Sequence, residues 1–153
     1  MDVTLINPFL NATLKVLETM AFVKVEAEKP YLKKDNVAQG DVSGIVGITG
    51  AAKGTISITF GEVCILKIVS NMFGEEMQEI NHEITDAVGE LTNMISGQAR
   101  QEIETKGKIL HGAIPTVITG KNHKLISMTK GPKIAIPFKT AAGNFTVEVC
   151  LEE

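Results

Sequence analysis

Residues 86–97 have the sequence Asp86-Ala-Val-Gly-Glu90-Leu-Thr-Asn93-Met-Ile-Ser-Gly97, and they lie within residues 81–106, a stretch typical of one long helix. A helix advances roughly 100° per residue, so the apolar side chains of this stretch share one face. Asp86, Glu90 and Asn93 fall on the opposite face, within roughly 60° of one another around the helix axis, and Gly97 falls within the same angular range. We therefore expect one side of the helix to cover a core and the other to present two carboxylates, an amide and a glycine.

Segments rich in β-branched residues flank this helix. Before it, residues 42–49 and 55–60 are separated by Gly50-Ala-Ala-Lys-Gly54, which is a hairpin signature with a longer loop. Apolar and hydroxyl side chains alternate along residues 55–60, so we expect one face of that strand to be wet or covered by polar contacts. After Gly112 the pattern is strand and turn, and it predicts strands over residues 115–119, 124–128, 133–139 and 145–151.

Two further helices are predicted before the long one. Apolar residues recur at three- and four-residue steps within residues 7–21, with Asn7 as a candidate N-cap and Pro8 in the first turn. Residues 62–72 repeat this spacing, and Gly74 provides a C-terminal stop signal.

The elements in order indicate an α+β fold. Residues 22–25 predict a short strand, and residues 26–39, which are polar and include Pro30, predict a loop. The chain is then helix, hairpin, two helices and several strands, which predicts helices packed on a largely antiparallel sheet. With 153 residues and no linker or low-complexity segment, we expect one domain over residues 1–153.

Composition and charge limit the classes of protein to which the chain can belong. Hydrophobic residues make up 44% and charged residues 22%, an ordinary globular balance. The formal charge of −3 argues against a nucleic-acid partner, because phosphate binding needs a concentrated basic face. No apolar run reaches about 18 residues, so no segment is expected to span a membrane.

The cysteines and the start of the chain favour the cytoplasm. Cys64 and Cys150 lie far apart in apolar runs, without a metal-like or redox spacing, so we expect two buried free thiols. The first residues, Met-Asp-Val-Thr, lack the basic region of a signal peptide. The three histidines have no ligand partner at helical spacing, so no metal site is expected in this chain: His82, His111 and His123.

On the helical pattern alone, acids and an amide on an outer face are most simply a solvated surface. The order of four residues changes that interpretation: Asp86 is followed four residues later by Glu90, three further by Asn93 and a little over twenty later by Pro115. This arrangement resembles the motif of the CheC/CheX/FliY family of chemotaxis phosphatases. Similar blocks surround it in the family's order: Val46-Gly-Ile-Thr-Gly50, Gly54-Thr-Ile-Ser-Ile-Thr-Phe60, Gly89-Glu-Leu-Thr-Asn93-Met and Pro115-Thr-Val-Ile-Thr-Gly120.

The resemblance favours the CheX branch of that family. CheC and FliY carry two such helices, whereas the first helix predicted here has Glu18 but Ala21 where a second motif would have Asn. FliY also carries a flagellar-switch domain, for which this chain has no counterpart. Residues 22–41 match the family poorly, and no function is drawn from them.

The resemblance implies that the chain hydrolyses the aspartyl phosphate of a phosphorylated response regulator, CheY or a relative. An amide suits this reaction, because its oxygen can accept from a water while its NH2 group donates to a phosphoryl oxygen. We expect Asn93 to orient the attacking water and Glu90 to dock the partner through one of its lysines. The Mg²⁺ would be held by the partner's acidic cluster, since this chain offers no cage of its own.

Asp86 and Gly97 are candidate partner-binding residues. Asp86 would either cap or orient the start of the helix or touch the partner, and the two interpretations have similar weight. Gly97 would permit close approach by a partner's backbone, the alternative being close packing of a neighbouring helix, which suits Gly89 better. Pro115 is expected to start a strand and to take no part in the chemistry.

Two other functions could use the same features. One is a non-catalytic module that binds a receiver or a motor component through the same helix face, and the other is a structural, self-associating domain. Only Asn93 separates catalysis from binding, since a binding module does not need an amide there. The family also implies a homodimer, for which the strands over residues 133–139 and 145–151 would leave an edge open to a second chain.

Overall fold

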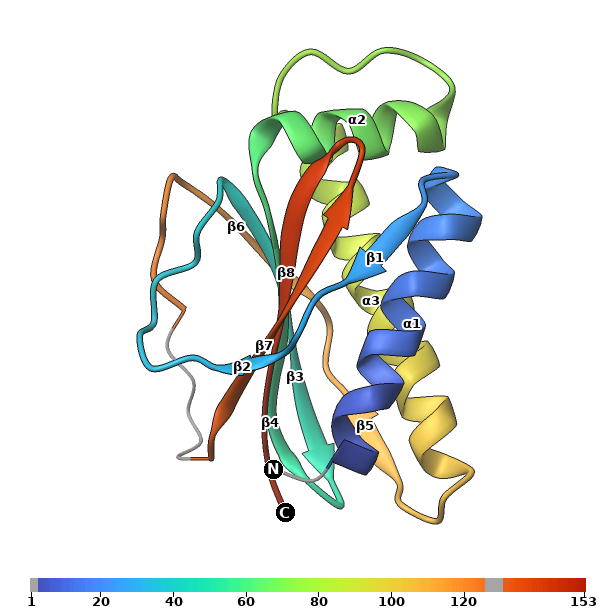
Figure 1. Cartoon of the computed structure of the whole chain (residues 1–153), viewed down its shortest axis with the longest axis vertical. Helices are drawn as coiled ribbons and strands as arrows, with labels where there is room; N and C mark the ends of the chain where they lie inside the picture. The colour runs from blue at the N-terminus through green and yellow to red at the C-terminus, as the bar shows by residue number, and fades with distance from the viewer. Residues whose placement is uncertain (1–2, 126–130) are drawn as a thin grey trace.

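One antiparallel sheet and three helices make up the chain in this computed structural model, which describes residues 3–125 and 131–153 (Figure 1). The helices are α1 (Val3–Ala21), α2 (Glu62–Phe73) and α3 (His82–Glu104). The strands are β1 (Val25–Ala27), β2 (Tyr31–Leu32), β3 (Val42–Gly50), β4 (Lys53–Phe60), β5 (Leu110–Gly112), β6 (Thr116–Thr119), β7 (Lys133–Thr140) and β8 (Gly143–Glu152). The predicted α+β class, with helices on an antiparallel sheet, is confirmed.

Strands β7 and β8 lie inside the sheet. The hydrogen-bonded order is β1-β7-β8-β4-β3-β5, while β2 also pairs with β7 and β6 also pairs with β3. The sheet therefore ends in β1 and β2 on one side and in β5 and β6 on the other. The expectation that β7 or β8 would leave an open edge is wrong, because β1 and β2 hydrogen-bond along the outer side of β7.

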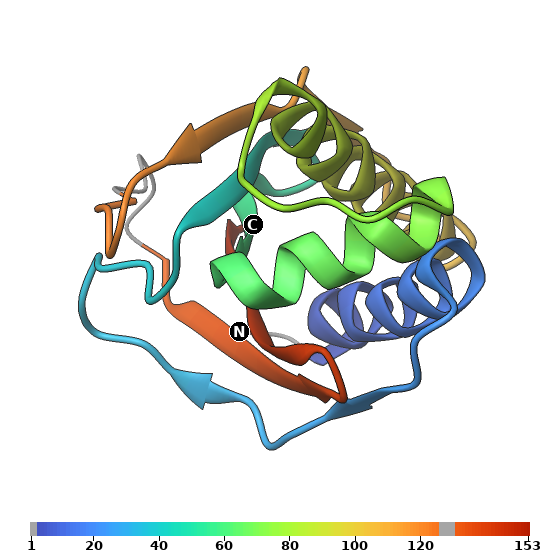
Figure 2. The same cartoon turned by 90° about the horizontal axis from the view of Figure 1, so that it is seen from above.

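The helices cover one face of the sheet. Figure 2 shows the sheet curving around them, with α1 and α3 side by side and α2 crossing one end of the strands. The core between these layers is apolar and fully buried, and includes Phe9, Leu17, Ile56, Ile58, Phe60, Leu91, Ile95 and Phe138. Each such side chain stabilises the fold by about 1.5–3 kcal/mol. Cys64 and Cys150 are free and buried, as expected, and burial raises the pKa of the Cys64 thiol to about 11.

Helix α1 begins earlier than predicted, at Val3, so Asn7 is not its cap and Pro8 lies inside it. Leu5 and Ile6 are only 1% and 5% exposed, and they extend the apolar face towards the start of the chain. Their burial therefore outweighs the helix hydrogen bond that Pro8 cannot donate.

The end of α2 and the start of α3 agree with the prediction, whereas α3 ends at Glu104, two residues before the predicted end at residue 106. Gly74 follows α2 with a left-handed φ of 70°, and its N–H donates to the carbonyl of Ser70. Asn81 caps α3, and its side chain accepts from the backbone N–H of Ile84 at 3.1 Å. A glycine stop and an asparagine cap are local signals, which explains why the sequence located them.

The first hairpin is confirmed, with β3 and β4 paired from Val42 and Phe60 to Ile48 and Gly54. Its connection is shorter than expected, because only Ala51 and Ala52 separate the strands.

Three of the short edge strands, β1, β2 and β5, were not located by the sequence, although the strand predicted over residues 22–25 overlaps β1 at Val25 and β6 lies within the strand predicted over residues 115–119. Strand β2 and most of β1 fall within residues 26–39, which were expected to be a loop, and β5 was not predicted at all. These strands have two or three residues each, so their pairing with longer neighbours decides their conformation rather than any local pattern. The strand expected over residues 124–128 lies mostly outside the described residues, and Lys124 forms an isolated bridge with Val37.

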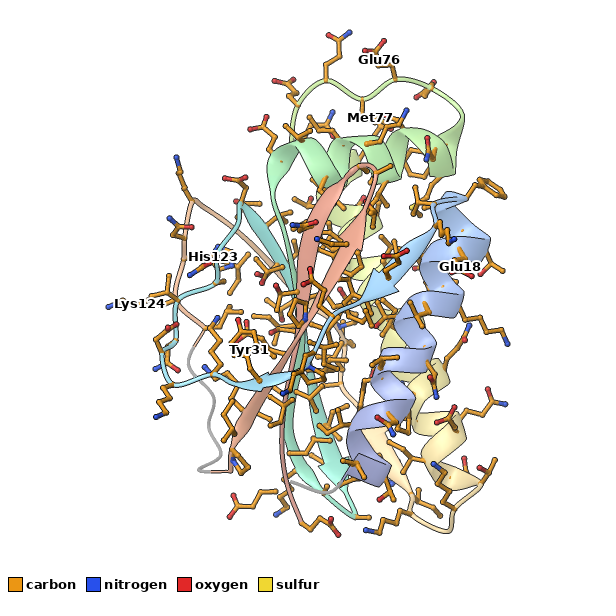
Figure 3. All side chains as sticks on the ribbon, viewed as in Figure 1. Glu18, Tyr31, Glu76, Met77, His123 and Lys124 are labelled. Carbon is orange, nitrogen blue, oxygen red and sulfur yellow. The ribbon has the colours of Figure 1, made fainter. Side chains whose placement is uncertain are left out.

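Polar contacts cover the sheet face turned away from the helices, which agrees with the alternation along residues 55–60. Ser43 Oγ is hydrogen-bonded to Thr59 Oγ1 at 2.6 Å and to Nε2 of His123 at 2.7 Å. Glu148, only 4% exposed, is paired with Nζ of Lys33 at 3.0 Å. Figure 3 shows His123 on this side of the sheet, opposite the helices.

None of the three helices is long and apolar enough to cross a membrane, as far as residues 3–125 and 131–153 show.

Candidate functional site

Helix α3 holds the predicted site residues on a rigid support. Its inner face is apolar and buried against the sheet and α1: Ile84, Ala87, Val88, Leu91, Ile95, Ala99 and Ile103. Thr92 is also buried, and its Oγ1 donates to the carbonyl of Val88 at 2.7 Å within the helix. The buried hydroxyl of Thr92 therefore has its hydrogen-bond partner within α3 itself.

The outer face of α3 carries Asp86, Glu90, Asn93 and Gly97, which we call the α3 stripe. The first three are exposed and Gly97 is half-buried, so the predicted orientation of the helix is confirmed. Neither Glu90 nor Asn93 makes a side-chain hydrogen bond or an ion pair with any residue that the structure describes. Both polar groups are therefore available to another molecule.

Asp86 does not cap the helix, since Asn81 has that role. The interpretation of Asp86 as a cap is therefore wrong. Oδ2 of Asp86 lies 3.2 Å from Nε2 of His82, one turn earlier on the same exposed surface. Such a surface pair contributes little stability, so Asp86 remains a candidate for contact with a partner.

One flank of the α3 stripe is the sheet edge formed by β5 and β6. A Cβ atom on Gly89 would lie 3.4 Å from Cγ2 of Val117 on β6. A Cβ atom on Gly112 of β5 would lie only 2.8 Å from the guanidinium of Arg100. Gly89 thus packs against a strand rather than a helix, and the edge follows the stripe from Gly89 to Arg100.

A β-bulge lies between these two contacts. Gly112 pairs with Ile48 and Thr116 pairs with Ile45, so residues 113–115 face only two residues of β3. Ile114, in the middle of the bulge, is 89% exposed. Because the flanking contacts reach Gly89 on one side and Arg100 on the other, the bulge lies alongside the middle of the α3 stripe, where Asn93 is. Pro115, the last residue of the sequence motif, belongs to this bulge and directly precedes β6, so the strand begins one residue later than predicted.

The other flank of the α3 stripe is α1. Nδ2 of Asn11 donates to Oε1 of Glu102 at 3.5 Å, and an open groove between the helices is lined by Lys15, Gln98 and Gln101 among others. Glu18 is exposed on α1 (Figure 3), but Ala21 is fully buried. A second amide could not reach solvent from the position of Ala21, so α1 carries no second site.

No group of three or more His, Cys, Asp and Glu side chains lies close enough together to hold a metal ion in the described part of the chain. The α3 stripe offers only Asp86 and Glu90 as carboxylates, on successive turns of one helix. Its chemistry is therefore that of an exposed amide flanked by acids.

Arg100 and Ile114 were missed by the sequence analysis. Arg100 is the only arginine of the chain, and seven residues after Asn93 it falls on the same side of the helix, so its spacing carried a usable signal. Ile114 had no such signal, because its exposure follows from the bulge, which depends on the register of β5 and β6 against β3.

The region that contains this site matches a family model. Residues 42–139 match the family described as Chemotaxis phosphatase CheX. The CheY-P phosphatase CheX of Thermotoga maritima is 27% identical over 128 residues, which cover 83% of each chain. Among solved structures, a chemotaxis protein CheX from Desulfovibrio desulfuricans is 51% identical, with a TM-score of 0.91 over 97% of this chain and 99% of that one. A CheX from Borrelia burgdorferi, in a CheX-CheY-BeF3-Mg²⁺ complex, is 29% identical, with a TM-score of 0.83 over 97% of each chain.

Proposed function

This chain belongs to the CheX family of chemotaxis phosphatases, and we propose that it hydrolyses the aspartyl phosphate of a phosphorylated response regulator, CheY or a relative. The observation that carries the proposal is the side chain of Asn93. It is a carboxamide, exposed and without a partner among the described residues, on a helix whose buried face packs against the sheet and α1. The CheX-CheY complex of Borrelia burgdorferi supports a receiver domain as the partner.

Asn93 acts by positioning a water. An acyl phosphate is already labile, so hydrolysis needs an oriented nucleophile more than a strong base. The amide oxygen of Asn93 accepts a hydrogen bond from the water, and its NH2 group donates to a phosphoryl oxygen. The amide does not change protonation, so its contribution does not depend on a titration of its own. Glutamine orients water in a comparable way in Ras-type enzymes.

Glu90 docks the partner. It lies three residues before Asn93 and is exposed, so its carboxylate can pair with a lysine of the receiver next to the phosphoryl group. Asp86 and Gly97 extend the contact along the helix, Asp86 through its charge and Gly97 by admitting close approach. The Mg²⁺ would be held by the acidic cluster of the receiver, and we expect this chain to contribute no ligand to it.

The same proposal includes a homodimer in the cytoplasm. The edge of the sheet at β5 and β6 has no further strand among the described residues, so a second copy of the chain could pair there. Sedimentation at micromolar concentration tests this, and a monomer would contradict it.

The alternative is a non-catalytic module that binds a receiver or motor component through the α3 stripe. The two functions are separated by mixing the protein with CheY charged by acetyl phosphate and following the loss of the phosphoryl group. Faster loss than in CheY alone supports the phosphatase. Binding without any acceleration would contradict it and favour the binding module.

A further inference from the structure

We propose that Arg100 forms an oxyanion-binding site at the end of the α3 stripe, and that it holds an oxyanion of the phosphorylated receiver during hydrolysis. The oxyanion is either a phosphoryl oxygen or a carboxylate beside the phosphorylation site, which share the same recognition chemistry. This inference rests on the proposed function, because it names a further contact between the α3 stripe and the receiver.

The guanidinium of Arg100 is anchored by one hydrogen bond. Its Nε donates to Oγ of Ser96 at 3.2 Å, and Ser96 is fully buried one turn earlier on α3. Its two terminal nitrogens make no hydrogen bond or ion pair with the described residues. An arginine fixed through Nε with both terminal nitrogens available can offer two parallel N–H groups to a carboxylate or phosphate.

Two glycines make room for this group. A Cβ atom on Gly112 would lie 2.8 Å from Cζ and 2.9 Å from Nε of Arg100, so the guanidinium occupies the space that any side chain at position 112 would need. A Cβ atom on Gly97 would lie 3.9 Å from a terminal nitrogen of Arg100. That nitrogen, Nη2, therefore lies between Gly97 and Gly112, where neither residue places a side chain between it and the α3 stripe.

The distance from Asn93 suits a single receiver surface. Side chains on a helix point back towards its N-terminus, so the guanidinium lies near the level of Gly97 rather than that of Arg100. Gly97 is one turn beyond Asn93, which is about 6 Å along the helix axis. A receiver whose phosphoryl group reaches Asn93 would bring neighbouring oxygens to Arg100.

The charges around the α3 stripe favour an oxyanion-binding role for Arg100. Asp86 and Glu90 are both acidic and exposed on the α3 stripe, and the whole chain has a formal charge of −3. The phosphoryl group and the carboxylates beside it are also negative, so Glu90 can pair with a receiver lysine but neither acid of the stripe can bind these oxyanions. Arg100 is the cation that flanks the stripe on the side of β5, whereas Lys15 lies on the other flank, in the groove beside α1, and Arg100 is the only arginine among the 15 basic residues of the chain.

The experiment measures the Kd of the receiver in its beryllofluoride-charged and uncharged forms, together with kcat/KM for hydrolysis. The variants are Arg100→Gln, which removes the charge, and Gly112→Ala, which displaces the guanidinium and keeps it. Lys106→Gln is the matched control, because it removes an exposed cation about two turns further along the chain. Thermal unfolding of each variant shows that the fold is intact.

We expect Arg100→Gln to raise the Kd for the beryllofluoride-bound receiver about tenfold or more. Gly112→Ala should also raise this Kd, whereas Lys106→Gln should leave it within about twofold. A loss of affinity confined to the beryllofluoride-bound receiver identifies a phosphoryl oxygen as the group that Arg100 holds. An equal loss of affinity for both receiver forms identifies a carboxylate. A wild-type Kd and kcat/KM in folded Arg100→Gln would overturn the inference, as would a loss of equal size in Lys106→Gln. If the wild-type protein binds the receiver without hydrolysing it, the proposed function fails while the Arg100 contact is still measured by Kd.

Discussion

A Cβ atom on Gly44 would overlap Oγ1 of Thr92, so helix α3 rests directly on the backbone of β3 at this point. Thr92 is fully buried, and it immediately precedes the exposed Asn93. The missing side chain at position 44 therefore sets the height of the helix above the sheet at the turn that carries the proposed catalytic amide.

Replacing Gly44 by alanine should force α3 away from β3. We expect Gly44→Ala to lower the free energy of unfolding by about 1–3 kcal/mol, measured by urea denaturation, because a methyl group is inserted into a packed interface. Gly47→Ala on the same strand is the control, since its Cβ would lie 3.7 Å from Cβ of Ala113, an ordinary contact. Equal effects of the two substitutions would show that the approach of α3 to Gly44 does not matter.

Asn93→Ala should lower the rate of receiver dephosphorylation by about 10²-fold or more, with affinity nearly unchanged. The reason is that the amide contacts the water and the phosphoryl group mainly in the transition state. The control is Gln101→Ala, which removes another exposed amide from α3 outside the α3 stripe. Full activity of Asn93→Ala would remove the residue from the mechanism.

Glu90→Ala should weaken receiver binding more than it slows bound-state hydrolysis, because its carboxylate pairs with the partner rather than with water. Titration calorimetry with beryllofluoride-charged receiver measures the Kd. Glu18→Ala on α1 removes an equally charged, exposed side chain outside the α3 stripe and should leave the Kd unchanged. An unaltered Kd in Glu90→Ala would contradict the docking role.

Ile114→Ala should also weaken receiver binding, by about tenfold, because an isoleucine exposed beside Asn93 would be buried by any partner that covers the α3 stripe. The control is Ile109→Ala, just before β5, which is 55% exposed. If Ile114→Ala leaves binding intact but changes the sedimentation of the protein alone, the bulge belongs to a dimer interface instead.

The ion pair on the opposite sheet face gives a prediction about stability. The side chains of Lys33 and Glu148 are only 9% and 5% exposed. Nζ of Lys33 also donates to the carbonyl of Val37 at 2.6 Å and lies 3.9 Å from Oδ1 of the exposed Asp35, so Glu148→Ala removes its nearest anion but not every partner. The substitution should therefore cost about 2 kcal/mol in urea unfolding. The Lys108–Glu153 pair is shorter, at 2.7 Å, but its side chains are 39% and 47% exposed. Glu153→Ala should therefore cost less than about 1 kcal/mol. Similar losses from both substitutions would show that burial does not set the strength of these pairs.

Features that depend on local pattern were predictable from the sequence. The face of α3 that carries Asn93 follows from helical periodicity, and both ends of the α2–α3 connection follow from Gly74 and Asn81. The start of α1 was misplaced because Pro8 is a strong local signal, whereas the burial of Leu5 and Ile6 depends on the rest of the fold.

Features that depend on contacts distant in sequence were not predictable. Gly44 and Thr92 are separated by the β3–β4 hairpin and α2, and nothing in either segment indicates that they meet. The contact of Arg100 with Gly112 likewise requires the register of β5 on β3, and the pairing of β1 and β2 with β7 requires the whole sheet. One sequence without its three-dimensional packing could therefore name Asn93 but not the two flanks of its site.

The location of Asn93 on the outer surface of a helix limits what the protein can act on. A cylinder curves away from whatever touches it, so it cannot enclose a metabolite of a few atoms or exclude bulk water around it. Free acetyl phosphate should thus survive in the presence of this protein. Selectivity would come from a partner protein that brings its own concave pocket and metal to the α3 stripe. In such a pair each partner supplies part of the reaction site, and this chain alone hydrolyses no small phosphate.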